Sequence, residues 1–491
     1  MKRSAISFFL LNFFLVTLSP LARHALDGSV WSAQTLHFAL GSGDDEPSLR
    51  STQRGLVELL GSRALSTLDG VTNVAGERIN PLILDPVRDW SRSKRRPIEI
   101  LQILEVGGAS VLVLSDLRGR LLWKALEESA GDVSHQTMEL LLAREGEYAL
   151  LPHRIAATYL EGLVLPPRIE NLASLLPPPV FVPHPTESPR APRSPSYLDA
   201  LEQEGIEIIR EACAVAENPA MLFSMGKDSM VMLSLAIRAF APMPVPFPIV
   251  IIDTRWVFQD MYRFLENLEQ RGELSTIVYV NPEAIERDMN PFDFGSPTHT
   301  DVTLTQAVRK MLDDYRFDFV FGGGRRDEEK SRAKERIFSL RNATHGWDPK
   351  SQRPELWNLY NTALVDGQSM RVFPVSNWTE LDIWRYIERE NVDLVPLYFS
   401  KLRPVVRRNG ALIMVDDERF PLETNEKVTI DYVRFRTLGC YPLTGGVKSS
   451  ATSVADIIRE LEASTVSERS SRVIDFDKGA SMEQKKKDGY F

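Results

Sequence analysis

The sequence predicts an α/β protein with a doubly wound, mostly parallel sheet in its C-terminal part and a small α+β region appended at the N-terminus. After Tyr197, short apolar segments alternate with segments of helical periodicity, which is typical of consecutive βαβ units. Pro248–Asp253 is a continuous apolar run that ends in a carboxylate, as in strands buried on both faces of a parallel sheet. A proline-rich segment separates the two parts.

That segment sets the expected domain boundaries. Residues 166–195 contain ten prolines, and this composition favours an extended linker over a packed core. We therefore expect an N-terminal region at 26–165, a linker at 166–196 and a single large domain at 197–491. Within the N-terminal region, a small α+β module is expected from about residue 97. It contains no motif whose chemistry we recognise.

The periodicity also places the individual elements. In the N-terminal region it predicts strands at 99–104 and 109–114 and a helix at 137–144. In the C-terminal domain it predicts helices at 197–215, 230–240, 256–268 and 303–315, and strands at 221–223, 248–253, 276–280 and 319–321. Right-handed crossovers between these strands would place a ligand at their carboxyl ends.

Composition restricts the class of protein. The 491 residues are 43% hydrophobic and 25% charged, as in ordinary globular proteins. The net charge is −9, from 58 basic and 67 acidic residues, which argues against a nucleic-acid partner. Cys213 and Cys440 are the only cysteines, and neither lies in a CxxC motif. A disulfide framework and a structural zinc site are therefore not expected. The cysteine usage fits a reducing compartment.

Residues 1–25 have the pattern of a targeting or anchoring segment. Lys2 and Arg3 precede an apolar run from Ile6 to Leu21, which has the length of a signal peptide and is short for a membrane span. Ala22–Ala25 offers no clean cleavage motif. The sequence leaves two alternatives open: a targeting or anchoring segment, which would contact a membrane if retained, and an upstream extension without function.

A phosphate-binding loop is the first candidate functional feature. The segment Ser224–Ser229 (SMGKDS) joins a predicted strand to a predicted helix. Small residues before a helix N-terminus present backbone N–H groups to an anion. Ser224, Gly226 and Ser229 supply such groups, Lys227 adds a positive charge, and Asp228 suits a partner of Mg²⁺.

The loop is not a GxxxxGK[ST] P-loop, because Met221 occupies the first glycine position and Asp228 the hydroxyl position. Taken alone, it is equally compatible with a helix N-cap in which Asp228 lies near the positive end of the dipole.

Residues at two other strand ends favour the nucleotide-binding alternative. Asp253 ends a strand, where a carboxylate can reach a ribose or an adenine edge. Gly323 and Gly324 follow another strand and permit close approach of the backbone to a ligand. Arg325 and Arg326 come next, and their forked donors can hold phosphoryl or sulfate oxygens. In Arg332–Arg336 acids and bases alternate, which favours a salt-bridged helix face. For His299, a phosphate contact and a hydrogen-bonded loop histidine both remain open.

Long motifs spread over the whole C-terminal domain closely resemble the small, ATP-binding subunit of bacterial two-subunit sulfate adenylyltransferases. That family belongs to the PP-loop ATP pyrophosphatase superfamily. The motifs stand in the same order over about 197–491; they are Ser224–Ser229, Val250–Met261, Phe321–Arg336, Trp347–Tyr360, Arg371–Trp384, Val395–Tyr398, Leu412–Asp417, Val433–Gly445, Ser467–Arg472 and Asp488–Phe491.

The resemblance implies a nucleotidyltransferase of sulfate assimilation and cysteine biosynthesis. ATP and sulfate would give adenylyl sulfate and pyrophosphate, with ATP bound together with Mg²⁺. A separate large GTPase subunit would drive the reaction with GTP, because this chain carries no GTPase motif. These substrates place the protein in the cytoplasm, in conflict with the signal-like N-terminus.

The resemblance also assigns residues. The catalytic set would be Lys227, Asp228, Arg325 and Arg326. The loop Ser224–Ser229 would hold the departing pyrophosphate with Mg²⁺, which Asp228 would partner. Asp253, Gly323 and Gly324 would lie against the nucleotide, and Arg434 and Arg436 would bind sulfate.

Some positions depart from the family pattern. Met225 and Arg255 stand where glycines are expected, Leu304 and Gln306 replace lysine and glutamate, and Lys448 replaces glutamate. An aliphatic residue is common at position 225 in this subfamily, but the changes at Arg255, Leu304 and Lys448 leave an alternative open: a catalytically impaired nucleotide-binding subunit of the same complex. A related reductase would need a nucleophilic cysteine near its C-terminus, and none follows Cys440.

Overall fold

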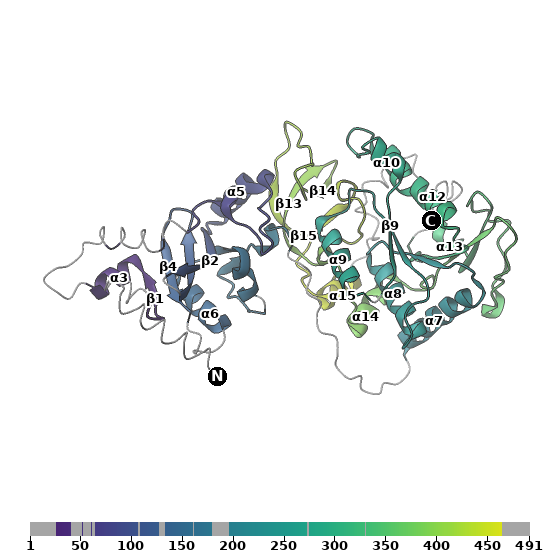
Figure 1. The fold of residues 1–491 in the computed structure, drawn as a ribbon, viewed down its shortest axis with the longest axis horizontal. Helices are drawn as coiled ribbons and strands as arrows, with labels where there is room; N and C mark the ends of the chain where they lie inside the picture. Colours follow the sequence, from purple (N-terminus) through teal and green to yellow (C-terminus); the bar gives the residue numbers. More distant parts are fainter. Residues whose placement is uncertain are drawn as a thin grey trace. The chain divides into compact units, whose positions relative to one another are not determined.

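The structure is a computed structural model of the chain. It describes residues 26–40, 52, 60, 64–106, 109–126, 133–160, 162–178, 196–272, 274–328 and 330–463. The signal-like segment at 1–25, most of the expected linker (179–195) and the two C-terminal motifs after residue 466 lie outside these ranges. The described chain forms two compact units, one within residues 1–179 together with 428–430, the other within 180–427 and 431–491 (Figure 1). No described helix is both long enough and apolar enough to cross a membrane.

The N-terminal unit is built on a six-stranded mixed sheet in the order β1-β4-β3-β2-β5-β6. Strands β1 to β4 pair antiparallel, whereas β5 pairs with β2, and β6 with β5, in parallel. The strands are β1 (Val30–Ser32), β2 (Ile98–Val106), β3 (Ala109–Asp116), β4 (Leu121–Ala125), β5 (Tyr148–Pro152) and β6 (Ile169–Asn171). Its helices are α3 (Ala33–Leu40), α5 (Leu84–Lys94) and α6 (Val133–Ala143).

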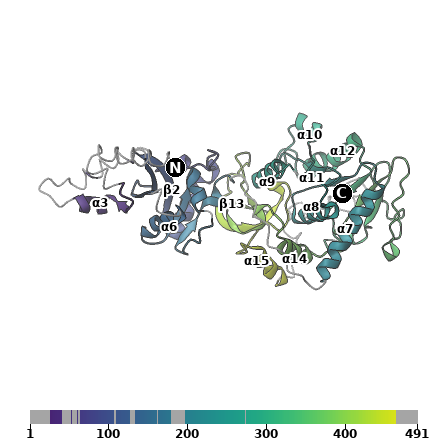
Figure 2. The same ribbon diagram turned by 60° about the horizontal axis from the view of Figure 1, so that its bottom comes forward.

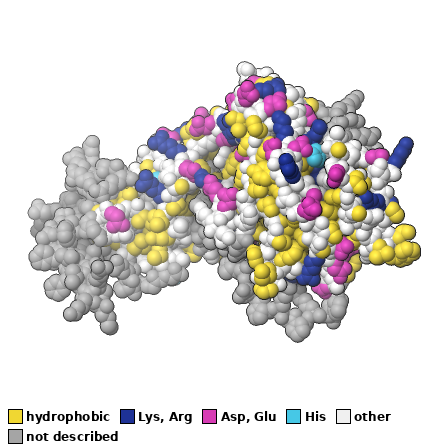
Figure 3. Space-filling view, turned by 45° about the vertical axis from the view of Figure 1, so that its right-hand side comes forward, with side chains coloured by type: hydrophobic (Ala, Val, Ile, Leu, Met, Phe, Trp, Pro, Cys, Tyr) yellow, Lys and Arg dark blue, Asp and Glu magenta, His cyan; other side chains and the backbone are white. Residues whose placement is uncertain are grey.

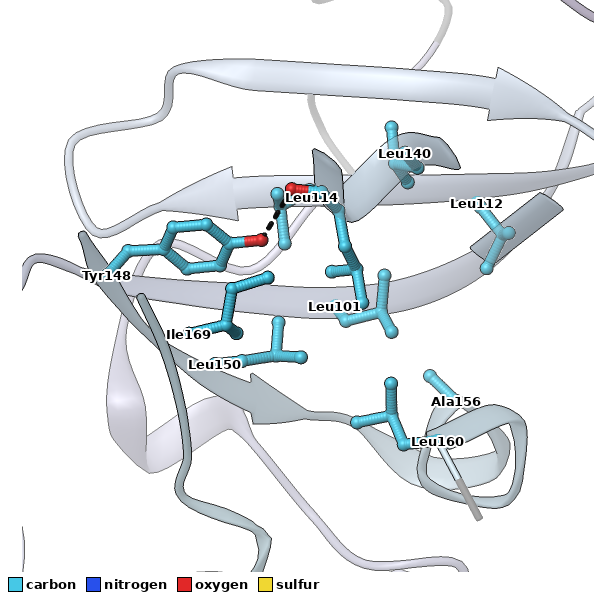
Figure 4. Packing of buried hydrophobic residues seen from close by; sticks show 10 residues of the cluster. Leu101, Leu112, Leu114, Leu140, Tyr148, Leu150, Ala156, Leu160 and Ile169 are labelled. Atoms are coloured by element: carbon cyan, nitrogen blue, oxygen red, sulfur yellow. Dashed lines mark hydrogen bonds between the residues drawn. The ribbon is translucent and has the colours of Figure 1, made fainter. Parts of the chain in front are cut away.

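This sheet has a hydrophobic core on each face. Successive side chains of a strand point to opposite faces, and β3 follows the rule: Val111 and Val113 enter one cluster with Trp123, and Leu112 and Leu114 enter another. Figure 4 shows the second cluster, in which the hydroxyl of Tyr148 donates to the carbonyl of Leu141 at 2.8 Å. The N-terminal unit therefore has a core of its own.

The start of the expected linker was wrong. Strand β6 pairs with β5, and a short 3₁₀ turn follows at Ala173–Leu175, so residues up to the late 170s belong to the N-terminal unit. The prolines at 166–167 and 177–179 flank a strand of only three residues, of which Ile169 alone is apolar. The high proline content of this segment therefore favoured a linker in the sequence analysis, although a strand forms there.

The C-terminal unit confirms the predicted doubly wound α/β fold. Its sheet has the order β11-β12-β10-β7-β8-β9, in which β11 alone is antiparallel. The chain moves outward from β7 through β8 to β9, then crosses to the other side of β7 to form β10. The strands are β7 (Ala220–Leu222), β8 (Ile249–Ile252), β9 (Thr276–Tyr279), β10 (Phe319–Phe321), β11 (Phe338–Arg341) and β12 (Ser369–Val372).

Helices cover both faces of this sheet (Figure 2). On one face, Met311 and Leu312 pack against Val250 and Val320 of the strands. The first two belong to α12 (Ala307–Tyr315), which continues a turn of π-helix at Asp301–Gln306. The remaining helices are α7 (Tyr197–Val215), α8 (Lys227–Phe240), α9 (Gln259–Gln270), α10 (Pro282–Glu286), α11 (Ser296–Thr300), α13 (Lys330–Ala333) and α14 (Glu380–Glu390).

A small closed barrel follows the sheet, and the sequence did not predict it. It consists of β13 (Lys401–Arg408), β14 (Ala411–Met414), β15 (Thr429–Arg434) and β16 (Gly445–Lys448). Val405, Leu412 and Val433 form its interior cluster. The final described helix is α15 (Val454–Glu462), which packs on α14.

Candidate functional site

The loop Phe223–Gly226 lies at the carboxyl end of β7, beside the point where the strand order reverses. In open α/β sheets this is where ligands bind. Met225 adopts a left-handed backbone with φ of 57° and is buried at 2% exposure. A left-handed backbone favours glycine, which explains why glycine is expected at position 225.

Small polar groups close the loop on itself. The hydroxyls of Ser224 and Ser229 lie 3.3 Å apart, and the Ser229 hydroxyl donates to the Gly226 carbonyl at 2.9 Å. The Gly226 N–H donates to the Ser224 hydroxyl at 3.4 Å. A Cβ on Gly226 would lie 3.2 Å from that hydroxyl, so the glycine allows the turn to be this tight.

Two buried cations flank the loop carboxylate. The Arg325 Nε donates to Asp228 Oδ1 at 2.6 Å, and Lys227 Nζ lies 3.3 Å from Asp228 Oδ2. Arg325 and Lys227 are each 1% exposed. The carboxylate of Asp228 thus orients two buried cations that come from two different strand ends.

The adjacent glycines serve packing within the chain. A Cβ on Gly323 would lie 3.3 Å from Asp228 Cβ and 3.4 Å from the Ser229 nitrogen, so β10 ends directly against the start of α8. A Cβ on Gly324 would lie 3.0 Å from Arg332 Nη1. The two glycines therefore allow the end of β10 to pack closely on other atoms of this chain. Their expected contact with a nucleotide stays a prediction.

Asp253 is held at the end of β8. Its Oδ1 accepts from the Arg255 N–H at 2.7 Å and from the Tyr262 hydroxyl at 2.9 Å. Arg255 has a φ of 63°, another left-handed position, and its guanidinium donates to Asp288 at 3.1 Å. The glycine expected at 255 is thus explained by the backbone, and the arginine side chain pairs with an exposed carboxylate.

The remaining predicted arginines pair with other side chains. Arg326 Nη1 donates to Asn377 Oδ1 at 2.5 Å. Arg434 forms a forked ion pair with Glu460 of α15, at 3.0 and 3.3 Å. Arg436 Nη2 donates to Glu380 at 2.9 Å.

Arg436 is connected to the loop through acidic side chains. The Glu380 N–H donates to Asp327 at 3.3 Å, and Asp327 lies 3.6 Å from Arg325 Nη1. Of the two predicted sulfate ligands, Arg436 is joined to the phosphate loop by this network, whereas Arg434 pairs with Glu460 on α15.

The segment Arg332–Arg336 carries the ion pairs that the alternating charges predict, but the paired side chains are buried. Arg332 is 9% and Glu335 4% exposed, and their Nη1 and Oε2 atoms lie 3.5 Å apart. Glu335 Oε1 also accepts from Arg341 Nη2 at 2.6 Å. Burial beside Arg341 lowers the pKa of Arg371 to about 9. Three arginines thus surround one buried glutamate behind Gly324.

His299 lies inside the unit at 0% exposure, so its ring presents no accessible atom for the phosphate contact that the sequence left open. Neither ring nitrogen has a hydrogen-bond partner among the described residues, so the hydrogen-bonded alternative is also wrong. Burial lowers the pKa of His299 to about 4.

The buried histidine predicts a pH dependence of stability. The unfolded chain binds a proton near pH 6.5, whereas the folded chain resists it down to about pH 4. The contribution of His299 is complete above pH 6.5 and is lost as the pH falls toward 4, by about 3 kcal/mol in total. We expect His299→Gln to flatten this part of the profile, measured by urea unfolding of the full chain from pH 7.5 to 4. Parallel profiles for the two proteins would contradict the prediction.

The space-filling view shows the surface charge of the C-terminal unit. On the face in Figure 3, acidic and basic side chains are interspersed over the described surface. Among the described residues, no group of three or more histidine, cysteine, aspartate or glutamate side chains could hold a metal ion.

Comparison with known proteins identifies relatives of the C-terminal unit. Residues 218–446 match the family model described as the phosphoadenosine phosphosulfate reductase domain. A sulfate adenylyltransferase subunit 2 of Marinobacter nauticus is 57% identical over 300 residues, which is 61% of this chain and 99% of the relative. That of Caulobacter vibrioides is 56% identical over 306 residues, 62% of this chain and 98% of the relative.

Solved structures show weaker likenesses. Phosphoadenylyl-sulfate reductase from Candida auris has a TM-score of 0.29 and 14% identity, over 42% of this chain and 93% of its own. FMN adenylyltransferase from Candida glabrata, in complex with ATP, has a TM-score of 0.30 and 16% identity, over 48% and 72%.

The loop, the sheet order and the family model together define the C-terminal unit as an α/β protein of the PP-loop superfamily. Because the curated relatives are matched over nearly their whole length at more than half identity, the chain belongs to the sulfate adenylyltransferase subunit 2 family. These relatives are nucleotidyltransferases by name. Their matches leave about two fifths of the chain uncovered.

Proposed function

We propose that this protein transfers the adenylyl group of ATP to sulfate, giving adenylyl sulfate and pyrophosphate, the first step of sulfate assimilation. One observation carries the proposal: Lys227 and Arg325, both buried, are oriented by Asp228 at the switch point of the sheet. This is a built site for a polyanion, in a chain that spans the full length of its adenylyltransferase relatives.

The chemistry requires positioning and charge neutralisation. A sulfate oxygen attacks the α-phosphorus, the bond to the bridging oxygen breaks, and its electron pair leaves with pyrophosphate. Sulfate is already ionised, so no general base is required. Lys227 and the N-terminus of α8 hold the pyrophosphate, and Arg325 and Arg326 hold the phosphoryl or sulfate oxygens. Arg436 is the first candidate for a sulfate ligand, and Asp253 the candidate contact with the adenosine.

Magnesium enters in this proposal as part of the substrate, Mg·ATP. Asp228 does not fit a resident metal site, because its two oxygens already face Arg325 Nε and Lys227 Nζ. We therefore derive no step through a protein-bound metal ion. The carboxylate orients the two cations that neutralise the phosphates.

A separate GTPase subunit supplies the driving force in this proposal. Adenylyl sulfate is a high-energy mixed anhydride, so the equilibrium favours ATP unless a second reaction is coupled to it. The subunit 2 name of the relatives implies a partner subunit for those proteins. We place the complex in the cytoplasm, where ATP, GTP and reduced cysteines coexist.

The function is tested by pyrophosphate release from ATP. The full chain is mixed with the large GTPase subunit of a relative, and sulfate, GTP or the partner is omitted in turn. Release that requires all of them is the expected result. ATP binding and complex formation without sulfate-dependent release would contradict the proposal and favour an impaired subunit.

Replacing Arg255 by glycine tests directly whether this arginine impairs catalysis. Its side chain pairs with Asp288, which is exposed, and its backbone already adopts the left-handed conformation that glycine prefers. We expect Arg255→Gly to change turnover by less than about two-fold, since the Asp253 hydrogen bond from the residue-255 N–H persists. A gain of ten-fold or more in the pyrophosphate assay would show that the arginine disables the site.

A further inference from the structure

A tyrosine from a distant segment contacts the phosphate loop. The hydroxyl of Tyr398 accepts a hydrogen bond from the backbone N–H of Lys227 at 2.7 Å. Lys227 is the first residue of α8, so this N–H is one of the donors that a helix N-terminus leaves without an intrahelical partner. A Cβ on Gly226 would lie 3.5 Å from the same hydroxyl. The tyrosine therefore meets the loop at the point where the helix begins.

The tyrosine is a fixed part of the site. Tyr398 is 1% exposed, and its ring packs edge-to-face on Trp384 with centroids 5.4 Å apart. Trp384 is itself 1% exposed. Moving the ring aside would empty a buried volume, which is costly in a close-packed interior. The hydroxyl is thus a permanent acceptor for the Lys227 N–H.

The loop has a conformation that needs such a support. Met225, two residues before Lys227, is held in the left-handed region, which a non-glycine residue adopts only when its surroundings impose it. The Lys227 side chain is directed into a buried ion pair with Asp228. Fixing the N–H between these two features keeps the loop in one shape before any ligand arrives.

The turn that carries Tyr398 also holds the segment of Arg436. This turn, Pro396–Tyr398, lies between α14 and β13. The Phe435 N–H donates to the Leu397 carbonyl at 2.9 Å, next to Arg436 in the chain. A single turn therefore contacts both the pyrophosphate side and the candidate sulfate side of the site.

We propose that Tyr398 is a positioning residue that preorganises the phosphate loop for ATP through its hydroxyl. This role rests on the proposed function, because it assumes that the loop binds the phosphates of ATP. It predicts that loss of the Tyr398 hydroxyl weakens ATP binding more than it lowers the free energy of unfolding.

The test compares Tyr398→Phe with Tyr386→Phe in the full chain. Tyr386 is a matched control, because it is also fully buried and packs edge-to-face on a tryptophan, Trp378, at 5.2 Å. We expect the Kd for Mg·ATP, measured by titration without turnover, to rise about ten-fold in Tyr398→Phe, as for one lost hydrogen bond in a preorganised site. In Tyr386→Phe it should rise less than two-fold.

With the GTPase partner present, the KM for ATP should rise in parallel in Tyr398→Phe, and the KM for sulfate should change less. A folded Tyr398→Phe protein with wild-type ATP affinity would overturn the proposal, as would equal losses of affinity in both variants. If the wild type binds ATP but releases no pyrophosphate, the proposed function fails while the comparison of Kd values still decides the role of Tyr398. A wild-type chain that does not bind ATP overturns both.

Discussion

Replacing Arg325 by glutamine is expected to lower the rate of sulfate-dependent pyrophosphate release by about 10²–10³-fold. The guanidinium is buried and donates to Asp228 at 2.6 Å. Without it, Asp228 retains only the Lys227 pair at 3.3 Å, and the site loses a fixed positive charge next to the leaving pyrophosphate. The rate is measured with saturating ATP, sulfate, GTP and partner subunit.

Two further variants separate charge from geometry and from general damage. Arg325→Lys keeps the charge and loses the planar fork, so its loss should be intermediate. Arg385→Gln removes an arginine that is 48% exposed and paired with Glu462, and turnover should stay within about two-fold of wild type. Full activity in a folded Arg325→Gln protein would remove Arg325 from the catalytic set.

Replacing Glu335 by glutamine is expected to give the largest loss of stability, about 3–5 kcal/mol in the free energy of unfolding. Glu335 accepts from Arg341 at 2.6 Å and faces Arg332 at 3.5 Å, with all three side chains buried. The substitution removes the charge of the carboxylate to which Arg341 donates, and leaves Arg332 with the more distant Glu328, at 3.9 Å. The change is measured by urea unfolding of the full chain at neutral pH.

The matched control is Glu283→Gln on α10. Glu283 also pairs with two cations, Arg287 at 2.9 Å and Lys310 at 3.3 Å, but its side chain is 34% exposed. Solvent screens such pairs, so the expected loss is much smaller than for Glu335→Gln. Similar losses for the two variants would mean that burial of the Glu335 cluster does not determine its contribution.

The sheet could be predicted because its parallel strands are short, continuous apolar runs. Phe319–Phe321 is found as expected, and the run predicted at 248–253 contains β8 at Ile249–Ile252. The barrel could not be predicted in this way. Its strand Lys401–Arg408 carries four basic residues and a proline, yet Arg403 is buried and pairs with Asp260 at 3.5 Å. The basic residues of this strand thus made it look unlike a buried strand in the sequence.

The candidate site also contains residues that the sequence could predict and residues that it could not. The grouping of Lys227, Asp228 and Arg325 follows from topology, because the carboxyl ends of neighbouring parallel strands meet at one edge of the sheet. The contact of Tyr398 with the loop depends on a buried side chain from a distant turn, for which the sequence contains no local signal. The same holds for Glu335, whose partner Arg341 follows on the antiparallel edge strand.

The two hydrophobic cores of the N-terminal sheet have a consequence for the ratio in which the two units of the chain are made. A region with its own core on both faces is a second folded body synthesised in the same chain as the nucleotidyltransferase. Fusion fixes their ratio at one to one, whatever the expression level. Any molecule that the N-terminal body binds is also held near the enzyme at a raised effective concentration, in the millimolar range for short tethers.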